Sequence, residues 1–135
     1  MIAEKYLSRI EKIDAIISNK VKDYKRWVEI AEGLGDFSVS ERVQSSKNLQ
    51  KIPNAIGRYI DIDREIEALK RERLEIINTL EQLPNTEYEL LYQVYVKGYT
   101  LKEVADYFDR SYDWVKKRKR KALLMVQAVL DEKTG

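Results

Sequence analysis

The chain has 135 residues, 36% of them charged and 44% hydrophobic, yet its formal net charge is only +2. It contains no cysteine and no histidine, which excludes disulfides, zinc fingers, iron–sulfur clusters and catalysis by a thiol or an imidazole. With only two prolines and five glycines, the composition favours long, solvated helices over a sheet-rich body.

The N-terminal residues predict neither a signal peptide nor a membrane anchor. Residues 1–6 lack the uninterrupted apolar core of a signal peptide. No apolar run in the chain approaches the ~20 residues that span a bilayer. We therefore expect a cytoplasmic protein.

A first long helix is predicted from about residue 3 to residue 32. Its apolar side chains recur at spacings of three or four, with charged residues between them. These residues are Tyr6, Ile10, Ile13, Ile17, Val21, Tyr24, Val28 and Ala31. Because Gly33 and Gly35 favour a left-handed cap, the helix is expected to end there.

A long connection is predicted over residues 33–52. Within it, residues 35–52 show no sustained apolar periodicity and are rich in Ser, Lys and Asn. Pro53 suits the first turn of a second helix, where its missing N–H is not needed. That helix is predicted over residues 53–83, and Arg73 interrupts its apolar stripe. The stripe matches the first in length and spacing and consists of Tyr59, Ile62, Ile66, Leu69, Ile76, Leu80 and Leu83.

Two helices of similar length joined by a loop should fold back on each other. Residues 1–84 are therefore expected to form an antiparallel helical hairpin, followed by a second domain over residues 85–135. Further apolar residues lie beside the main stripes, namely Ile16, Trp27, Ile30, Ile56, Ile60 and Ile77. They favour oligomerisation through the hairpin, most simply as a homodimer, and packing against the C-terminal domain is the alternative.

The C-terminal domain has the spacing of a helix-turn-helix. The segments 86–89 (TEYE) and 100–103 (TLKE) both have the form of a capping box, and Ser111 is placed to cap a third helix. Ala105 is small enough for the crossing of two helices, and Val115, ten residues later, can return an apolar side chain to the core. Any three-helix bundle with well-capped helices is the alternative.

Six consecutive cations, Lys116 to Lys121, lie in this third helix, predicted over about residues 111–130. Such a helix repels itself unless an anion compensates the charge, and DNA phosphate is the natural candidate. Six consecutive residues cover every face of a helix, so Arg118 and Lys119 are expected to point inward with Val115. A solvated charged face and a nuclear-import signal are the alternatives.

Roles toward DNA follow from position, because the N-terminal part of a recognition helix enters the major groove. The residues expected to read base edges are Tyr112, Asp113, Lys116, Lys117 and Arg120. The residues expected to hold phosphates are Thr100, Lys102, Arg110, Ser111, Lys119 and Lys121. Trp114 faces the other way on this helix and is expected to pack.

The C-terminal sequence resembles the region-4 helix-turn-helix of bacterial sigma factors. The similar positions are Leu90-Leu91, Tyr95-Val96, Thr100 to Ala105, Ser111, Val115 and Ala122-Leu123. The chain is more similar still to small phage and prophage proteins that borrow this module, the RinA/ArpU-like late-gene transcriptional regulators, and residues 6–10 and 42–46 add to that similarity.

This resemblance implies a regulator in a bacterial host that binds a promoter, with RNA polymerase as a further partner. Two residues depart from the pattern of the module. Asp109 stands where glycine is usual, and Arg118 stands where an apolar residue is common. Aspartate tolerates the left-handed conformation better than most residues, so the turn is still expected.

The leading hypothesis is a dimeric, sequence-specific transcription regulator of phage or prophage type. A phage small terminase subunit, which also joins a helix-turn-helix to oligomerising helices, and a protein-binding adaptor with a basic helix are the alternatives. No enzyme, catalytic residue, metal or cofactor is expected, since chemistry without His or Cys would need carboxylates in a pocket. Asp61, Asp63 and Glu65 cluster in sequence but spread around a helix surface.

Overall fold

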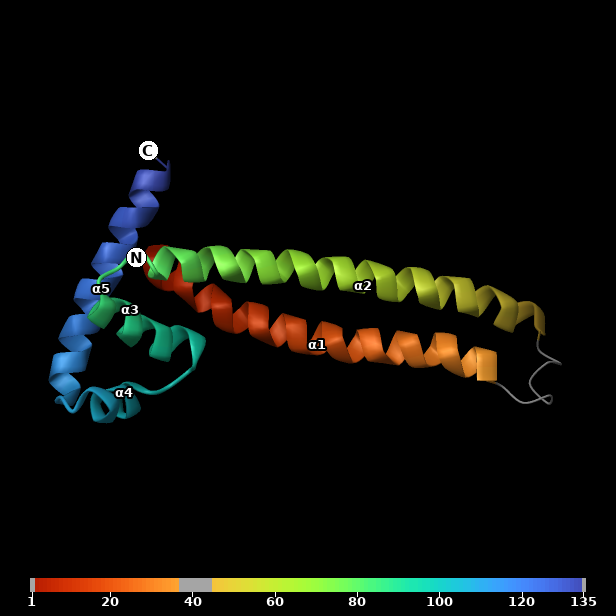
Figure 1. Ribbon diagram of the computed structural model, residues 1–135, viewed down its shortest axis with the longest axis horizontal. Coiled ribbons are helices and arrows are strands. Elements are labelled where there is room, and N and C mark those ends of the chain that lie inside the picture. The colour runs from red at the N-terminus through yellow and green to blue at the C-terminus, as the bar shows by residue number, and fades with distance from the viewer. Residues whose placement is uncertain (1, 37–44, 135) are drawn as a thin grey trace. The chain divides into compact units, whose positions relative to one another are not determined.

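The computed structural model describes residues 2–36 and 45–134, with side chains described for 2–33 and 54–134. Within these ranges the chain is helical and has no strand, which confirms the predicted all-α class. None of the described helices has an apolar stretch long enough to cross a membrane. The elements, labelled in Figure 1, are α1 (Ile2–Asp36), α2 (Ser45–Leu80), α3 (Asn85–Leu91), the π-helical turn η2 (Tyr92–Val96), α4 (Leu101–Phe108) and α5 (Tyr112–Thr134).

The predicted loop 33–52 is wrong at both ends, because α1 extends beyond Gly33 and α2 begins before Pro53. Gly33 does not adopt the left-handed conformation, so its backbone freedom does not end the helix. Proline favours the first turn of a helix because it lacks one N–H, yet a helix interior can also contain it at the loss of one hydrogen bond. Residues 37–44, which include most of the motif 42–46, lie outside the described residues.

The chain divides into two compact units. We call Met1–Asp14 together with Arg71–Gly135 the helix-turn-helix unit, and Ala15–Lys70 the hairpin unit. The helix-turn-helix unit therefore contains the first turns of α1 and the last turns of α2 in addition to the C-terminal helices. This compact unit extends well beyond residues 85–135.

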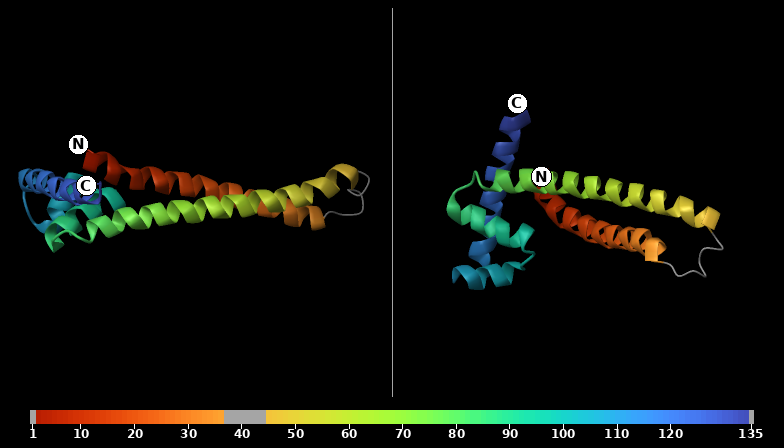
Figure 2. Two further views of the ribbon diagram at one scale, coloured as in Figure 1. Left: turned by 90° about the horizontal axis from the view of Figure 1, so that it is seen from above. Right: turned by 45° about the vertical axis from the view of Figure 1, so that its right-hand side comes forward.

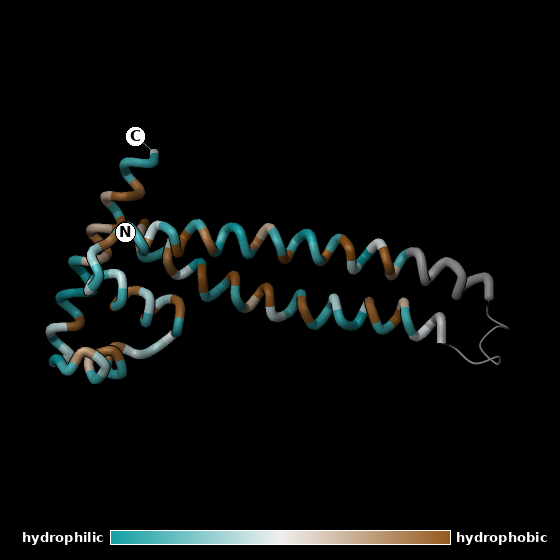
Figure 3. Tube along the Cα trace, in the orientation of Figure 1, coloured by the Kyte–Doolittle hydropathy of each residue, from teal (hydrophilic) through white to brown (hydrophobic). Residues whose placement is uncertain are grey.

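In the hairpin unit, α1 and α2 run antiparallel. Lys20 of α1 forms an ion pair with Glu65 of α2, and the rings of Tyr24 and Tyr59 meet edge to face with centroids 5.5 Å apart. Later residues of α1 thus contact earlier residues of α2, as expected for the predicted antiparallel hairpin. Figure 3 shows apolar residues recurring along both helices.

In the helix-turn-helix unit, the first turns of α1 are part of the core. Side chains from α1, α2 and the C-terminal helices are completely excluded from solvent, among them Ala3, Leu7, Ile10, Leu80, Leu90, Leu91, Val104, Val115, Ala122 and Val126. Two views in Figure 2 show how α3, α4 and α5 gather in this unit. Its helices are thus layered on one another, and each covers the apolar face of its neighbours.

Buried Thr79 joins three helices of the same unit. Its hydroxyl shares a hydrogen bond of 3.0 Å with the hydroxyl of Tyr6 on α1, and Lys133 Nζ of α5 donates to it at 3.0 Å. The hydroxyl itself donates to the Glu75 carbonyl at 3.1 Å. A polar side chain can be fully buried here because all its hydrogen-bonding capacity is used.

Candidate nucleic-acid interface

The helix-turn-helix consists of α4 and α5, and short-range hydrogen bonds define its turn. The Thr100 N–H donates to the Glu103 carboxylate at 3.0 Å and the Glu103 N–H donates to the Thr100 hydroxyl at 3.2 Å, which confirms the capping box at 100–103. The N–H and hydroxyl of Thr100 together lower the pKa of Glu103. At the start of α5, the Ser111 hydroxyl accepts from the Trp114 N–H at 3.0 Å, as predicted for a cap.

The turn itself passes through Asp109, which ends α4 with φ 53° and ψ 48°. This is the left-handed conformation that the module usually assigns to glycine. Asp109 is the one non-glycine residue with positive φ among the described residues. The departure from the module's glycine therefore leaves the turn geometry intact, because aspartate tolerates this region better than most residues.

The other predicted capping box, at residues 86–89, is wrong. α3 begins directly after Pro84, and no side chain caps its first turn. Thr86 is thus already inside the helix, from where its hydroxyl cannot cap the first N–H groups. Glu89 instead accepts a hydrogen bond of 3.2 Å from the hydroxyl of Tyr107 on α4.

The six cations of α5 divide between two faces. Arg118 and Lys119 are half-buried and the other four are exposed, which confirms the predicted inward pair. At about 100° per residue, the residues of α5 that lie within roughly 80° of the direction opposite Arg118 include five in its N-terminal half. They are the five predicted base-reading residues, Tyr112, Asp113, Lys116, Lys117 and Arg120, and all of them are exposed.

Within this exposed face, side chains are arranged in pairs one turn apart. Lys116 Nζ lies 5.2 Å from the ring centroid of Tyr112, and Lys117 Nζ lies 3.1 Å from Asp113 Oδ2. Exposed pairs of this kind contribute little to stability, so DNA groups can replace either partner without a large cost. The arrangement joins four of the five predicted base-reading residues in two separate pairs.

The predicted phosphate-holding residues are exposed, with one exception. Thr100, Lys102, Arg110, Ser111 and Lys121 are exposed, whereas Lys119 is half-buried with its Nζ 5.6 Å from the ring centroid of Tyr95. The guanidinium carbon of Arg110 lies 5.4 Å from the ring centroid of Trp114. Ser111 accepts its capping bond through oxygen, so its hydroxyl hydrogen remains available to a phosphate.

The sequence did not reveal the partner of Arg118. Arg118 Nη1 donates to Oε1 of Glu87 at 3.1 Å, and only 5% of the Glu87 side chain is exposed. The same guanidinium lies over the Trp114 ring, 5.0 Å from its centroid. A signal was present, because Glu87 precedes buried Leu90 and Leu91 by three and four residues and so shares their face of α3.

The first turn of α1 lies beside the basic helix. The Ala3 N–H donates to Oε1 of Gln127 on α5 at 3.0 Å. A cavity of about 400 Å³ is lined there by Glu4, Leu101, Lys116, Lys119, Arg120 and Leu123. The region next to the exposed face is thus mainly cationic, with Glu4 as its acidic member.

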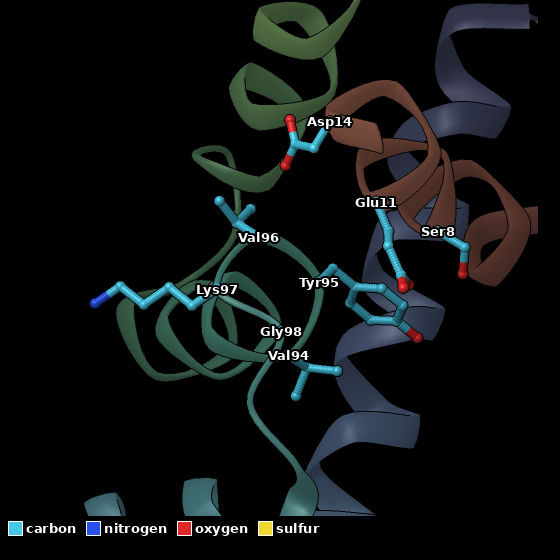
Figure 4. Close-up of a pocket in the computed structure, with 8 residues that line it drawn as sticks. All are labelled: Ser8, Glu11, Asp14, Val94, Tyr95, Val96, Lys97 and Gly98. Atoms are coloured by element: carbon cyan, nitrogen blue, oxygen red, sulfur yellow. The ribbon is translucent and has the colours of Figure 1, made fainter. Parts of the chain in front are cut away.

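A second cavity has the opposite character. Its volume is about 410 Å³, and Figure 4 shows the residues that line it, Ser8, Glu11, Asp14 and Val94 to Gly98. Asp14 is partly neutralised by Arg73, whose Nε donates to it at 2.7 Å. Its carboxylates make this cavity a poor binding site for a polyanion, so it is not part of the candidate interface.

Residues 79–128 match the family model of sigma-70, region 4. This segment is a sigma-region-4-like helix-turn-helix. Region 4 is a DNA-binding module and has no catalytic role, so the chain contains a helix-turn-helix of a DNA-binding type. No curated protein and no solved structure matches the chain.

The matched segment contains α3, η2, α4 and most of α5, but none of α1. Buried Ala3, Leu7 and Ile10 therefore belong to the core of this unit without belonging to the matched module. In this chain the region-4 module has an additional helical layer from the N-terminus.

Proposed function

We propose that this protein is a sequence-specific DNA-binding transcription regulator of phage or prophage type, with α5 in the major groove. One observation carries the proposal. The five residues placed for base reading form the exposed face of a helix that holds six consecutive cations, and this helix is the second of a region-4-like helix-turn-helix. A polyanion is the partner that such a face requires.

The chemistry of the face fits a duplex. Lysine and arginine donate to guanine O6 and N7, and the Asp113 carboxylate can accept from the cytosine amino group. Lys102, Arg110, Lys119 and Lys121 supply positive charge to the flanking phosphates, which fixes the register of α5 along the groove. Base readout and phosphate contact thus come from different residues.

The regulator acts as a homodimer through the hairpin unit. In that unit the side chains of Ile56 and Ile60 remain 37% and 41% exposed, and Trp27 and Ile30 are half-buried. A second hairpin is the simplest surface of matching composition, and four helices bury more apolar area than two. A dimer presents two recognition helices and therefore binds two half-sites.

RNA polymerase is a further partner in this proposal. Its support is the similarity of residues 79–128 to a region of a polymerase subunit family. Co-purification of the protein with host polymerase in the absence of DNA tests this part separately from DNA binding.

The DNA proposal is tested by selecting a preferred site from random duplexes and titrating two variants against it. Lys117→Ala should weaken binding to the selected site by about 1–3 kcal/mol and change binding to mixed-sequence DNA little. Lys121→Ala should weaken binding to all sequences similarly. It should also flatten the slope of log affinity against log salt concentration, the salt slope, by ~1. Equal losses for both variants that do not depend on salt would overturn the assignment.

A further inference from the structure

We infer that Arg118 is a positioning residue that holds α5 in one rotation about its axis through Glu87 and Trp114. Through that rotation it decides which members of the basic run face DNA. The inference rests on the proposed function and adds a residue that separates specific from non-specific binding. Arg118 itself makes no DNA contact in this account.

The contacts of Arg118 are directional. Its Nη1 donates to Oε1 of Glu87 at 3.1 Å, and the exposed fractions of the two side chains are 32% and 5%. The guanidinium also lies over the Trp114 ring, and that ring packs against Phe108 with centroids 5.7 Å apart. A charge-assisted hydrogen bond to a buried carboxylate constrains angle as well as distance.

Arg118 occupies a position where apolar packing is missing. The buried apolar residues of α5 are Val115 and then Ala122, and the six residues between them are all cations. Nearly two helical turns therefore contain no buried apolar side chain. Arg118 lies in the middle of this stretch and supplies an inward contact there by ion pairing.

Because the basic run is continuous, the rotation of α5 affects base-specific binding but not the positive charge that α5 presents to DNA. Because every residue from Lys116 to Lys121 is a cation, any rotation of α5 presents positive charge to phosphates. Only the observed rotation, in which Arg118 points toward Glu87, leaves Lys116 and Arg120 exposed on the face predicted to read bases. Loss of the ion pair between Arg118 and Glu87, the anchor of α5, should therefore reduce specific binding while non-specific affinity for DNA persists.

The test compares Arg118→Met and Glu87→Gln with the wild-type protein. The probes are the selected duplex site and a mixed-sequence duplex of equal length, measured at several salt concentrations and at a temperature where circular dichroism shows a native helix content. For Arg118→Met we expect the ratio of specific to non-specific affinity to fall by about tenfold or more, because removal of one partner leaves a buried charge. The salt slope on mixed-sequence DNA should stay at the wild-type value.

Glu87→Gln keeps the side-chain volume and a neutral acceptor for Arg118, so it decides the question if Arg118→Met fails to fold. Its specificity ratio should fall by roughly threefold, since the hydrogen bond keeps the charged Arg118 donor but loses the charge of its acceptor. Lys121→Ala is the matched control, for which the slope changes and the ratio does not. Emission from Trp114 in a Trp27→Phe background should also shift in both anchor variants.

Two results would overturn the inference. Equal losses on both DNAs with a slope lowered by ~1 would make Arg118 a phosphate contact. An unchanged ratio in both folded variants would show that the ion pair does not position α5. If the wild-type protein selects no site at all, the proposed function fails first, and that outcome is visible before any variant is made.

Discussion

The helix-turn-helix unit and the hairpin unit bury their apolar residues to different degrees. In the former, side chains from α1, α2, α3, α4 and α5 reach zero exposure. Among the described residues of the latter, only Ala55, Ile62 and Ile66 are buried, and the α1 stripe from Ile17 to Val28 is half-exposed. Several helical layers can enclose a core, whereas two helices leave their outer faces to solvent. The hairpin unit thus leaves more of its apolar side chains exposed than the helix-turn-helix unit does.

The largest expected effect concerns the N-terminal layer of the helix-turn-helix unit. Leu7 is fully buried and lies outside the region-4 match, so Leu7→Ala should destabilise the protein by about 2–5 kcal/mol. The matched control is Leu74→Ala, because 56% of Leu74 is exposed. Its effect should stay within about 0.5 kcal/mol. Denaturant unfolding measures the free energy of unfolding of both variants. Equal losses would contradict the prediction that the N-terminal layer is part of the core.

The next effect concerns the outer face of the hairpin unit. Burial of one Ile side chain is worth about 1.5–3 kcal/mol, so Ile56→Ser with Ile60→Ser should weaken the proposed dimer by roughly 3 kcal/mol or more. Light scattering after size exclusion should then report a monomer where the wild type is a dimer. Leu124→Ser, at a site 55% exposed in the other unit, should leave the dimer unchanged. A monomeric wild type, or a larger ring, would contradict the dimer.

A smaller effect concerns the turn of the helix-turn-helix. Asp109 is held in the left-handed region, which glycine adopts without strain. Asp109→Gly should therefore stabilise the protein, by up to about 1 kcal/mol. Asp106→Gly, inside α4 and three residues earlier, should destabilise it by roughly 0.5 kcal/mol through lost helix propensity. Thermal melts that shift in the same direction for both would contradict this account of the turn.

The smallest effect concerns pH and the cap of α4. The N–H and hydroxyl of Thr100 lower the pKa of Glu103, and a carboxyl with a lowered folded pKa stabilises the protein above its unfolded value of about 4.3. That stability is lost as the pH falls through the folded pKa. In Glu103→Gln the melting temperature should thus decline less between pH 5 and pH 3 than in the wild type. Glu132→Gln, exposed near the end of α5, should retain the wild-type decline.

Sequence periodicity predicted the helical class and the helix-turn-helix because these depend on local patterns. The capping box at Thr100 and the left-handed Asp109 require only a few neighbouring residues, and both predictions are confirmed. The box at residues 86–89 has the same sequence form but fails, since Pro84 already starts the helix earlier. A local motif is thus reliable only when no neighbouring residue fixes the helix boundary.

Contacts between distant segments were harder to predict. The inward direction of Arg118 followed from its distance to Val115, but its pairing with Glu87, 31 residues away, depends on how α3 and α5 pack. The contribution of Ala3 and Leu7 to the helix-turn-helix unit likewise depends on tertiary packing. The apolar stripe predicted that α1 has a buried face, but a stripe does not name the surface that covers it.

The affinity for duplex DNA as a function of salt tests the DNA-binding proposal most directly. Four cations are assigned to phosphates, Lys102, Arg110, Lys119 and Lys121, and each neutralised phosphate contributes about −0.9 to the slope of log affinity against log salt. We predict a slope of roughly −3.6 for each bound helix-turn-helix, and about twice that for a dimer on two half-sites. Failure to retard duplex DNA at low salt, or an affinity that does not change with salt, would contradict it.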